Sequence, residues 1–338
     1  RACSPVGEQA LFVLGRQTMS TTIGIALLVW VLGAGQGFAQ QAAPGPRGRK
    51  AQLKTAIGML ERGRYGPAIK QSREIVAKRP NHAGARAVMG IALVRSGRIS
   101  DALPQLELSQ GTMAYTQLGG YGAHADALRA AGFGGEAWAL RSQQLGGDQP
   151  RLMQVKVYCH GIDDLLSIGD VGGALALGET VVSIAPNAPA AHAFYSTALL
   201  WNGDVESAEF HDWLSRISSS TRVSRVPINQ AWLGEVVGDV VAGQRAWGRA
   251  KLMRKKEPRI AAWEAGWWRR QGNPEMGWTV ANGGRFSSHQ SSDLLAERVL
   301  LLRMLGRDED ANQELERFGL LFPAHPVLHE LETVVNRE

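Results

Sequence analysis

Residues 63–97 of this 338-residue chain read GRYGPAIKQSREIVAKRPNHAGARAVMGIALVRSG. The pattern predicts a helix, a turn at Pro80-Asn81 and a second helix, because proline cannot continue a helix. Gly63 and Gly97 stand where the chain reverses, since glycine adopts positive φ without strain. The stretch therefore predicts helices packed as hairpins that turn at glycine.

The same frame repeats along the chain, with spacings of 34, 35, 37, 34, 35, 34 and 34 residues between the reversal glycines. These are Gly63, Gly97, Gly132, Gly169, Gly203, Gly238, Gly272 and Gly306. A small residue follows each by five positions, and a large apolar residue precedes it by four, except at Gly234. One helix pair cannot bury its apolar stripe alone, so pairs stack. We predict an all-α superhelical solenoid of about eight helix hairpins with a C-terminal capping helix at 327–335.

This unit resembles the tetratricopeptide repeat family, whose repeat has 34 residues, and the resemblance covers about residues 49–325. The Gly-rich stretch at 146–150 separates N-terminal units, residues 49–150, from C-terminal units and the cap, residues 151–338. The resemblance implies a protein-binding solenoid whose first helices line a concave groove. Chaperone-receptor members clamp a carboxylate with Lys and Asn. Here those positions hold Leu53, Ile57 and Val88, so that function is not carried over.

Residues 1–39 have the pattern of a signal peptide. The apolar run at 23–32, IGIALLVWVL, has the length of a signal core and is too short to span a bilayer. Gly37 and Ala39 suit a cut after Ala39, and residues 1–18 are either a longer n-region or an over-extended start upstream of Met19. A Pro/Gly linker is predicted at 40–48. We expect export to the periplasm, with an uncleaved inner-membrane anchor as the alternative.

Charge and motif content favour a binding protein over an enzyme. The net charge of +6 and the pI near 9.5 tilt the expectation mildly toward anionic partners. The chain has no HExxH motif, nucleophile elbow or P-loop. His325 and His329 lack a third ligand, and Cys159 is expected to be a packing residue. We expect no catalysis, no cofactor and no metal.

The family resemblance also implies which side chains line the groove. The candidates are Lys156, Asp163, Trp201, Arg225, Trp232, Arg259, Arg269, Arg270 and Arg303. Arginine forks onto carboxylates, and tryptophan offers a flat apolar surface. We expect an acidic protein or peptide as partner, or an anionic glycan. Nucleic acid is not expected, and the membrane is contacted only through an uncleaved signal.

These inferences predict a non-catalytic scaffold or adaptor of the bacterial cell envelope, serving assembly, secretion or polysaccharide export. The choice of process is an analogy at the level of fold. The alternative is a carbohydrate-binding or polysaccharide-processing envelope factor that uses the Trp/Arg-rich region from Trp232 to Trp278. A basic run at 245–259 is expected to face outward from a second helix.

Overall fold

The computed structural model describes residues 46–146, 149–217, 223, 225–253, 258–283 and 290–335. The predicted signal peptide and residues 40–45 of the predicted linker lie outside this part of the chain. Helix α1 begins at Pro46, so the end of that linker is helical. Within the described residues all regular structure is helical, and no helix there is long and apolar enough to cross a membrane.

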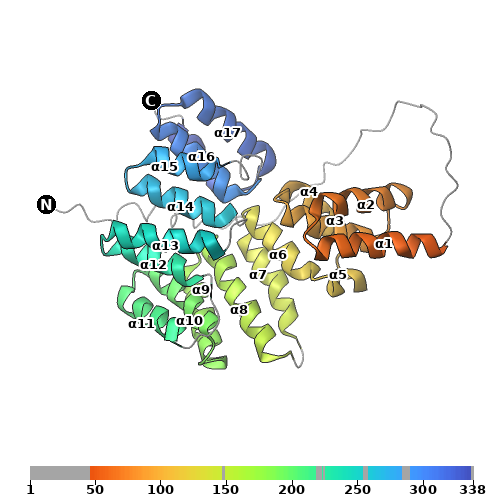
Figure 1. The fold of residues 1–338 in the computed structure, drawn as a ribbon, viewed down its shortest axis with the longest axis horizontal. Coiled ribbons are helices and arrows are strands. Elements are labelled where there is room, and N and C mark those ends of the chain that lie inside the picture. The colour runs from red at the N-terminus through yellow and green to blue at the C-terminus, as the bar shows by residue number, and fades with distance from the viewer. Residues whose placement is uncertain are drawn as a thin grey trace.

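In the part of the chain that the structure describes, the helices follow one another as eight antiparallel pairs (Figure 1). The pairs are α1 (Pro46–Glu61) with α2 (Tyr65–Lys78), α3 (Ala83–Arg95) with α4 (Ile99–Glu107), α6 (Gly120–Ala130) with α7 (Gly134–Ser142), α8 (Arg151–Leu166) with α9 (Val171–Ile184), α10 (Pro189–Asn202) with α11 (Val205–Ile217), α12 (Arg225–Val236) with α13 (Val240–Met253), α14 (Pro258–Arg270) with α15 (Pro274–Ala281), and α16 (Ser292–Met304) with α17 (Asp308–Leu321). Helix α18 (Val327–Val335) ends the array. A short helix α5 (Met113–Gln117) and a 3-10 turn η3 (Gln143–Leu145) interrupt the rhythm and were not predicted. The solenoid of eight hairpins is confirmed.

Each hairpin turns where the glycine frame predicts. All eight glycines have positive φ, between 67° at Gly306 and 91° at Gly132. At seven of the eight turns, all except the one at Gly238, the residue after the glycine donates its N–H to the carbonyl of the residue four before the glycine, as from Arg98 to Leu93 at 2.9 Å. This bond satisfies a carbonyl that the helix end leaves without a partner. The alanines five positions after the glycines are fully buried between paired helices, as at Ala68.

The exception at Gly234 has a packing reason. A Cβ built on Gly234 would lie 2.9 Å from the backbone nitrogen of Gly243, which occupies the small-residue position of the same unit. Helices α12 and α13 therefore approach backbone to backbone, and the missing large side chain would have no room. The sixth unit, which is degenerate by sequence, keeps the repeat geometry through two facing glycines.

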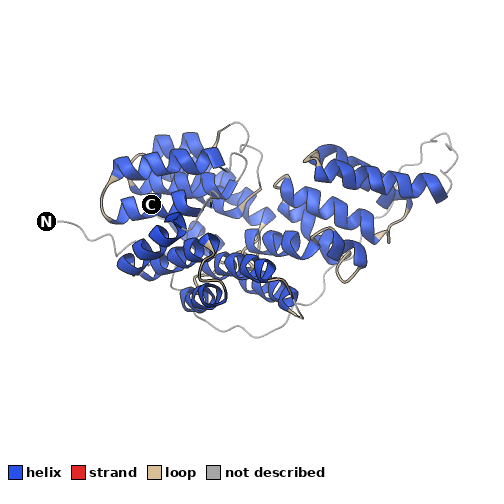
Figure 2. Cartoon of the chain, turned by 60° about the horizontal axis from the view of Figure 1, so that its bottom comes forward, coloured by secondary structure: helices blue, strands red, loops and turns tan. Residues whose placement is uncertain are grey.

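The last unit packs against the early units, a contact that the repeat pattern does not predict. Leu295 and Val299 of α16, Phe318 of α17 and Leu331 of α18 belong to one hydrophobic core with residues of α1–α6. The backbone N–H of Gln290 donates to Gly97 O at 3.0 Å, and the Ser292 hydroxyl donates to Ala130 O. Figure 1 shows the blue C-terminal helices beside α4 and α6, and Figure 2 shows the all-helical body from a second side. The superhelix thus closes on itself between its last and its early units.

Candidate functional site

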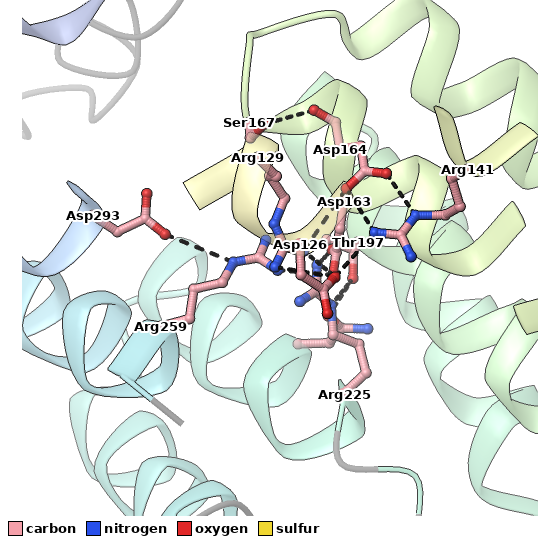
Figure 3. A network of polar contacts seen from close by, with 11 residues as sticks. Asp126, Arg129, Arg141, Asp163, Asp164, Ser167, Thr197, Arg225, Arg259 and Asp293 are labelled. Atoms are coloured by element: carbon pink, nitrogen blue, oxygen red, sulfur yellow. Dashed lines mark hydrogen bonds and ion pairs between the residues drawn. The ribbon is translucent and has the colours of Figure 1, made fainter. Parts of the chain in front are cut away.

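Closure brings charged side chains from six helices into one network, which we call the polar hub (Figure 3). It consists of Asp126 and Arg129 on α6, Arg141 on α7, Asp163 and Asp164 on α8, Arg225 on α12, Arg259 on α14 and Asp293 on α16. Four carboxylates face four guanidinium groups, so the formal charges of the hub cancel.

Asp163 lies at the centre of the hub and is buried. Its carboxylate accepts from Arg225 Nη2 at 2.6 Å and from Arg259 Nη1 at 3.0 Å, and Arg129 Nη1 lies 3.8 Å away. Burial alone would raise the pKa of this carboxyl, but the nearby Arg225, Arg259 and Arg129 outweigh burial and lower the pKa. Asp163 therefore stays ionised and joins its own unit to three others.

Arg225 is buried and is contacted by a hydroxyl group, a carboxylate and aromatic rings. Its Nε donates to Thr197 Oγ1 at 2.8 Å, and its guanidinium carbon lies 4.9 Å from the ring centre of Trp263 and 5.6 Å from that of Trp232. Burial lowers the pKa of Arg225 to about 10, which leaves it charged at neutral pH. Cation–π contacts and the ion pair with Asp163 compensate the burial of this charge.

Arg141 binds the neighbouring carboxylate in a fork. Its Nε donates to Asp164 Oδ2 at 2.7 Å and its Nη2 to Asp164 Oδ1 at 3.3 Å, while the same Nη2 reaches Asp126 at 3.0 Å. Burial raises the pKa of Asp164, whereas burial lowers that of the adjacent His160 to about 4. The hub combines buried, mutually paired charges with a neutral histidine, and none of its described carboxylates lacks a cationic partner.

The structure brings together Asp163, Arg225, Trp232 and Arg259 of the predicted groove residues. It does not bring the rest to the hub. Arg269 pairs with Glu297 at 3.0 Å, Arg270 with Glu235 at 2.6 Å, and Arg303 with Asp308 at 2.6 Å. Trp201 packs against the core of α8–α10, and Lys156 is exposed on α8.

The positive charge of the predicted groove is therefore neutralised within the chain. All five predicted arginines have carboxylate partners within the chain, and Asp163 and Arg225 are buried. Positions carried over from the family identify the face but not the counter-charges that meet it after closure. The signal available in the sequence was the pair Asp163-Asp164 in a helix that is otherwise largely apolar in this part.

The other candidate chemical groups are packing or surface residues. Cys159 is buried in the core of α8–α10, and burial raises its thiol pKa to about 12. His325 packs against Gly132, where an added Cβ would come within 2.5 Å of its ring, while His329 is exposed. Among the described residues there is no group of three or more His, Cys, Asp or Glu side chains that could hold a metal ion.

A second concave feature lies on the outside, between α11 and α13, and we call it the outer groove. Its volume is about 580 Å³. Helix α11 contributes Glu206, Glu209, Phe210, Trp213 and Arg216, and α13 contributes Ala242 and Arg249. Leu233 and Gln230 of α12 form the floor between these walls, with buried Asp212 of α11.

The α11 wall exposes large aromatic side chains. Phe210 is 55% exposed and Trp213 48%, and their rings stack with centres 6.2 Å apart and planes 27° apart. Ile217, one turn further along α11, is also exposed. Sequence reasoning missed this surface because it followed the first helices, whereas Phe210, Trp213 and Ile217 recur at i, i+3 and i+7 on a second helix.

A chain of polar contacts crosses one end of the outer groove. It links Arg216, Asp212, Gln230 and Arg249, and we call these four residues the bridge. Arg216 Nε lies 3.2 Å from Asp212 Oδ2, which accepts from Gln230 Nε2 at 3.5 Å, and Gln230 Oε1 accepts from Arg249 Nη2 at 2.7 Å. Burial raises the pKa of Asp212 to about 6, against the opposing effects of Arg216 and Gln230. The bridge thus fixes two arginines at the same end of the groove and contains one carboxylate.

No protein-family model matches the sequence, and no curated protein matches it. Among solved structures, a tetratricopeptide repeat protein from Parabacteroides merdae is 13% identical over 86% of this chain and 100% of its own, with a TM-score of 0.46. Pseudomonas aeruginosa pilF is 14% identical over 62% of this chain and 94% of its own, with a TM-score of 0.44. A thermophilic tetratricopeptide repeat protein from Thermus thermophilus is 12% identical over 54% of this chain and 98% of its own, with a TM-score of 0.46.

The repeat itself assigns the fold. Among the described residues, eight helix pairs turn at positive-φ glycines spaced 34–37 residues apart, and their small residues are buried at the helix crossings. The chain is a tetratricopeptide-type α-solenoid.

Proposed function

We propose that this chain is a non-catalytic protein-binding scaffold and that the outer groove is its docking surface. Folds of the tetratricopeptide type are generally protein-interaction scaffolds. The observation that carries the proposal is the exposed, stacked pair Phe210 and Trp213 in a groove between two helices. Exposed aromatic side chains in concave surfaces are the usual anchors of protein interfaces.

The polar hub is a poor docking surface by comparison. A ligand at Asp163 or Arg225 would have to separate buried ion pairs, and breaking such a pair costs about 3–5 kcal/mol. The arginines Arg269, Arg270 and Arg303 already pair with carboxylates, which weakens the case for an acidic partner at the concave face. Binding at the outer groove needs no such rearrangement.

We further propose that the scaffold acts in the cell envelope, in assembly, secretion or polysaccharide export. This rests on the signal-like pattern of residues 1–39. Sequencing the amino terminus of exported material tests it, and a start at Gln40 is the expected result. A longer mature chain in the membrane fraction would favour the anchored alternative.

A glycan-binding role finds less support in the tryptophans. Trp247 and Trp267 are fully buried, and Trp263 lies against Arg225 and Arg259. A sugar-binding platform needs an exposed ring, whereas Trp247 and Trp267 are covered and Trp263 is half-buried with two guanidinium groups against its ring.

Photo-crosslinking tests the docking surface. A crosslinking amino acid replaces Glu209, which lines the outer groove, or Lys54, an exposed control on α1. We expect position 209 alone to capture one protein. That purified protein should bind the natural chain at least about tenfold more tightly than the Phe210→Ala, Trp213→Ala variant. Equal capture from both positions, or a partner indifferent to the double variant, would refute the proposal.

A further inference from the structure

The outer groove is chemically different at its two ends. Glu206 and Glu209 lie toward the start of α11, while Arg216 lies near its end. Arg249 joins Arg216 through the bridge, so both arginines are at the same end of the groove. The apolar side chains Phe210, Trp213 and Leu233 occupy the space between. The groove is therefore acidic at one end, apolar in the middle and basic at the other.

The walls favour a helix over an extended segment. Helices α11 and α13 use their backbone N–H and C=O groups within their own turns, so they offer no strand edge to an extended peptide. Glu206 and Arg216 are ten residues apart on α11, which corresponds to about 15 Å at 1.5 Å per residue. Three turns of a partner helix fit this length.

The charges set the direction of that helix. The bridge carries two guanidinium groups and one carboxylate, which leaves a net positive charge that attracts acidic residues. The carboxylates Glu206 and Glu209 attract basic residues at the opposite end. Helices commonly carry acidic residues in the first turn and basic residues in the last, so such a helix runs antiparallel to α11.

We propose that the outer groove binds an amphipathic helix of a partner protein, with its acidic first turn over Arg216 and Arg249 and its basic last turn over Glu206 and Glu209. The apolar stripe of the helix covers Phe210, Trp213 and Leu233. This rests on the proposed function and adds the class and direction of the ligand. It also places the predicted preference for acidic groups at the bridge instead of the concave face.

Two labelled peptides of 14 residues test the proposal on the full chain. Both have the same composition and the same leucine stripe, one with Glu in the first turn and Lys in the last, the other reversed. By fluorescence anisotropy the first peptide should bind at least about tenfold more tightly. The neutral variant Arg216→Gln, Arg249→Gln should reduce this preference, because only Glu206 and Glu209 still set the direction. The variant Arg216→Glu, Arg249→Glu makes both ends acidic and should abolish it. The control Lys54→Glu, Arg64→Glu makes the same charge change on an exposed, remote unit and should retain the preference.

The charge variants are used only if their circular dichroism and thermal midpoint match the natural chain, and the neutral pair replaces the acidic pair if that one unfolds. Equal affinity for the two peptides, or no saturable binding of either, overturns the proposal. A dimer that Phe210→Ala, Trp213→Ala abolishes would assign the groove to a second copy, and vesicle binding lost in that variant would assign it to lipid; both overturn it as well. If peptide direction has no effect but the crosslinked partner still depends on Phe210 and Trp213, the docking surface stands and only the ligand class is wrong.

Discussion

The polar hub and the outer groove both combine arginines, carboxylates and aromatic rings, yet they have opposite energetic character. At the hub each charged side chain pairs with another part of the chain, as Arg225 does with Asp163 and Trp263. At the groove Trp213 and Phe210 remain exposed, and Asp212 Oδ1 has no hydrogen-bond partner among the described residues. The same residue types therefore hold the fold at one place and remain available for binding at the other.

The difference follows from where the solenoid closes. First helices face inward, and closure between α16 and the early units brings their charges within bonding distance of one another. Second helices face outward, so nothing in the described chain covers the aromatic side chains of α11. Location in the superhelix, and not residue type, decides which arginine-rich surface can meet a partner.

The largest expected effect is on the hub. Asp163→Asn removes the charge that compensates buried Arg225 and should lower the free energy of unfolding by about 3–5 kcal/mol. Urea denaturation followed by circular dichroism measures it. The control Asp293→Asn changes a half-exposed hub carboxylate 3.8 Å from Arg259 and should cost under about 1 kcal/mol. Equal effects of the two variants would contradict a buried centre.

The next largest loss of stability should come from a substitution in α18 that weakens the contact between the last and the early units. Leu331→Ala removes a buried side chain from the core shared with the early units and should cost about 2–5 kcal/mol. Leu320→Ala on α17 is the matched control, because that leucine is exposed, and it should have little effect. Amide hydrogen exchange should report faster exchange in α3 and α6 as well as in α16–α18. Faster exchange limited to α16–α18 would argue that closure is not cooperative.

These two regions also show what could be predicted from the sequence. The turn glycines were predicted because positive φ is a local demand that glycine meets. The common face of Asp163, Arg225 and Arg259 was predicted from the repeat register. Their pairing was not, because it joins residues up to 96 positions apart and depends on curvature accumulated over several units. The outer groove was missed since its shape depends on how two successive second helices are placed, which no single unit records.

Asp212 of the outer groove and Asp163 of the polar hub should contribute to stability with opposite dependence on pH. The pKa of Asp212 is raised to about 6, so the unfolded chain ionises this group before the folded chain does as pH rises from about 4. The contribution of the protonated group is full below pH 4 and is lost through pH 6, about 1–3 kcal/mol in all. The pKa of Asp163 is lowered, so its contribution is present above pH 4 and is lost as pH falls further.

Asp212→Asn tests this directly. The variant should be more stable than the natural chain at pH 7 by about 1–2 kcal/mol and should lack the decline in stability between pH 4 and 6. Thermal melts at half-unit pH intervals measure both. Asp170→Asn, a helix-capping carboxylate on the surface, is the control and should retain the decline. A natural chain whose stability rises from pH 4 to 6 would show that ionised Asp212 is stabilised by Arg216 more than burial opposes it.

Trp213 should contribute least to stability and most to binding. Trp213→Ala should alter the free energy of unfolding by less than about 1 kcal/mol, because half of the side chain is already in water. Trp267→Ala removes a fully buried ring and should cost about 3–5 kcal/mol. Partner binding at pH 7 should show the reverse order: lost in Trp213→Ala and retained in Trp267→Ala at temperatures where that variant is folded. A Trp213→Ala variant that is destabilised as much as Trp267→Ala would mean that the α11 surface packs within the fold, and the distinction between the two regions would disappear.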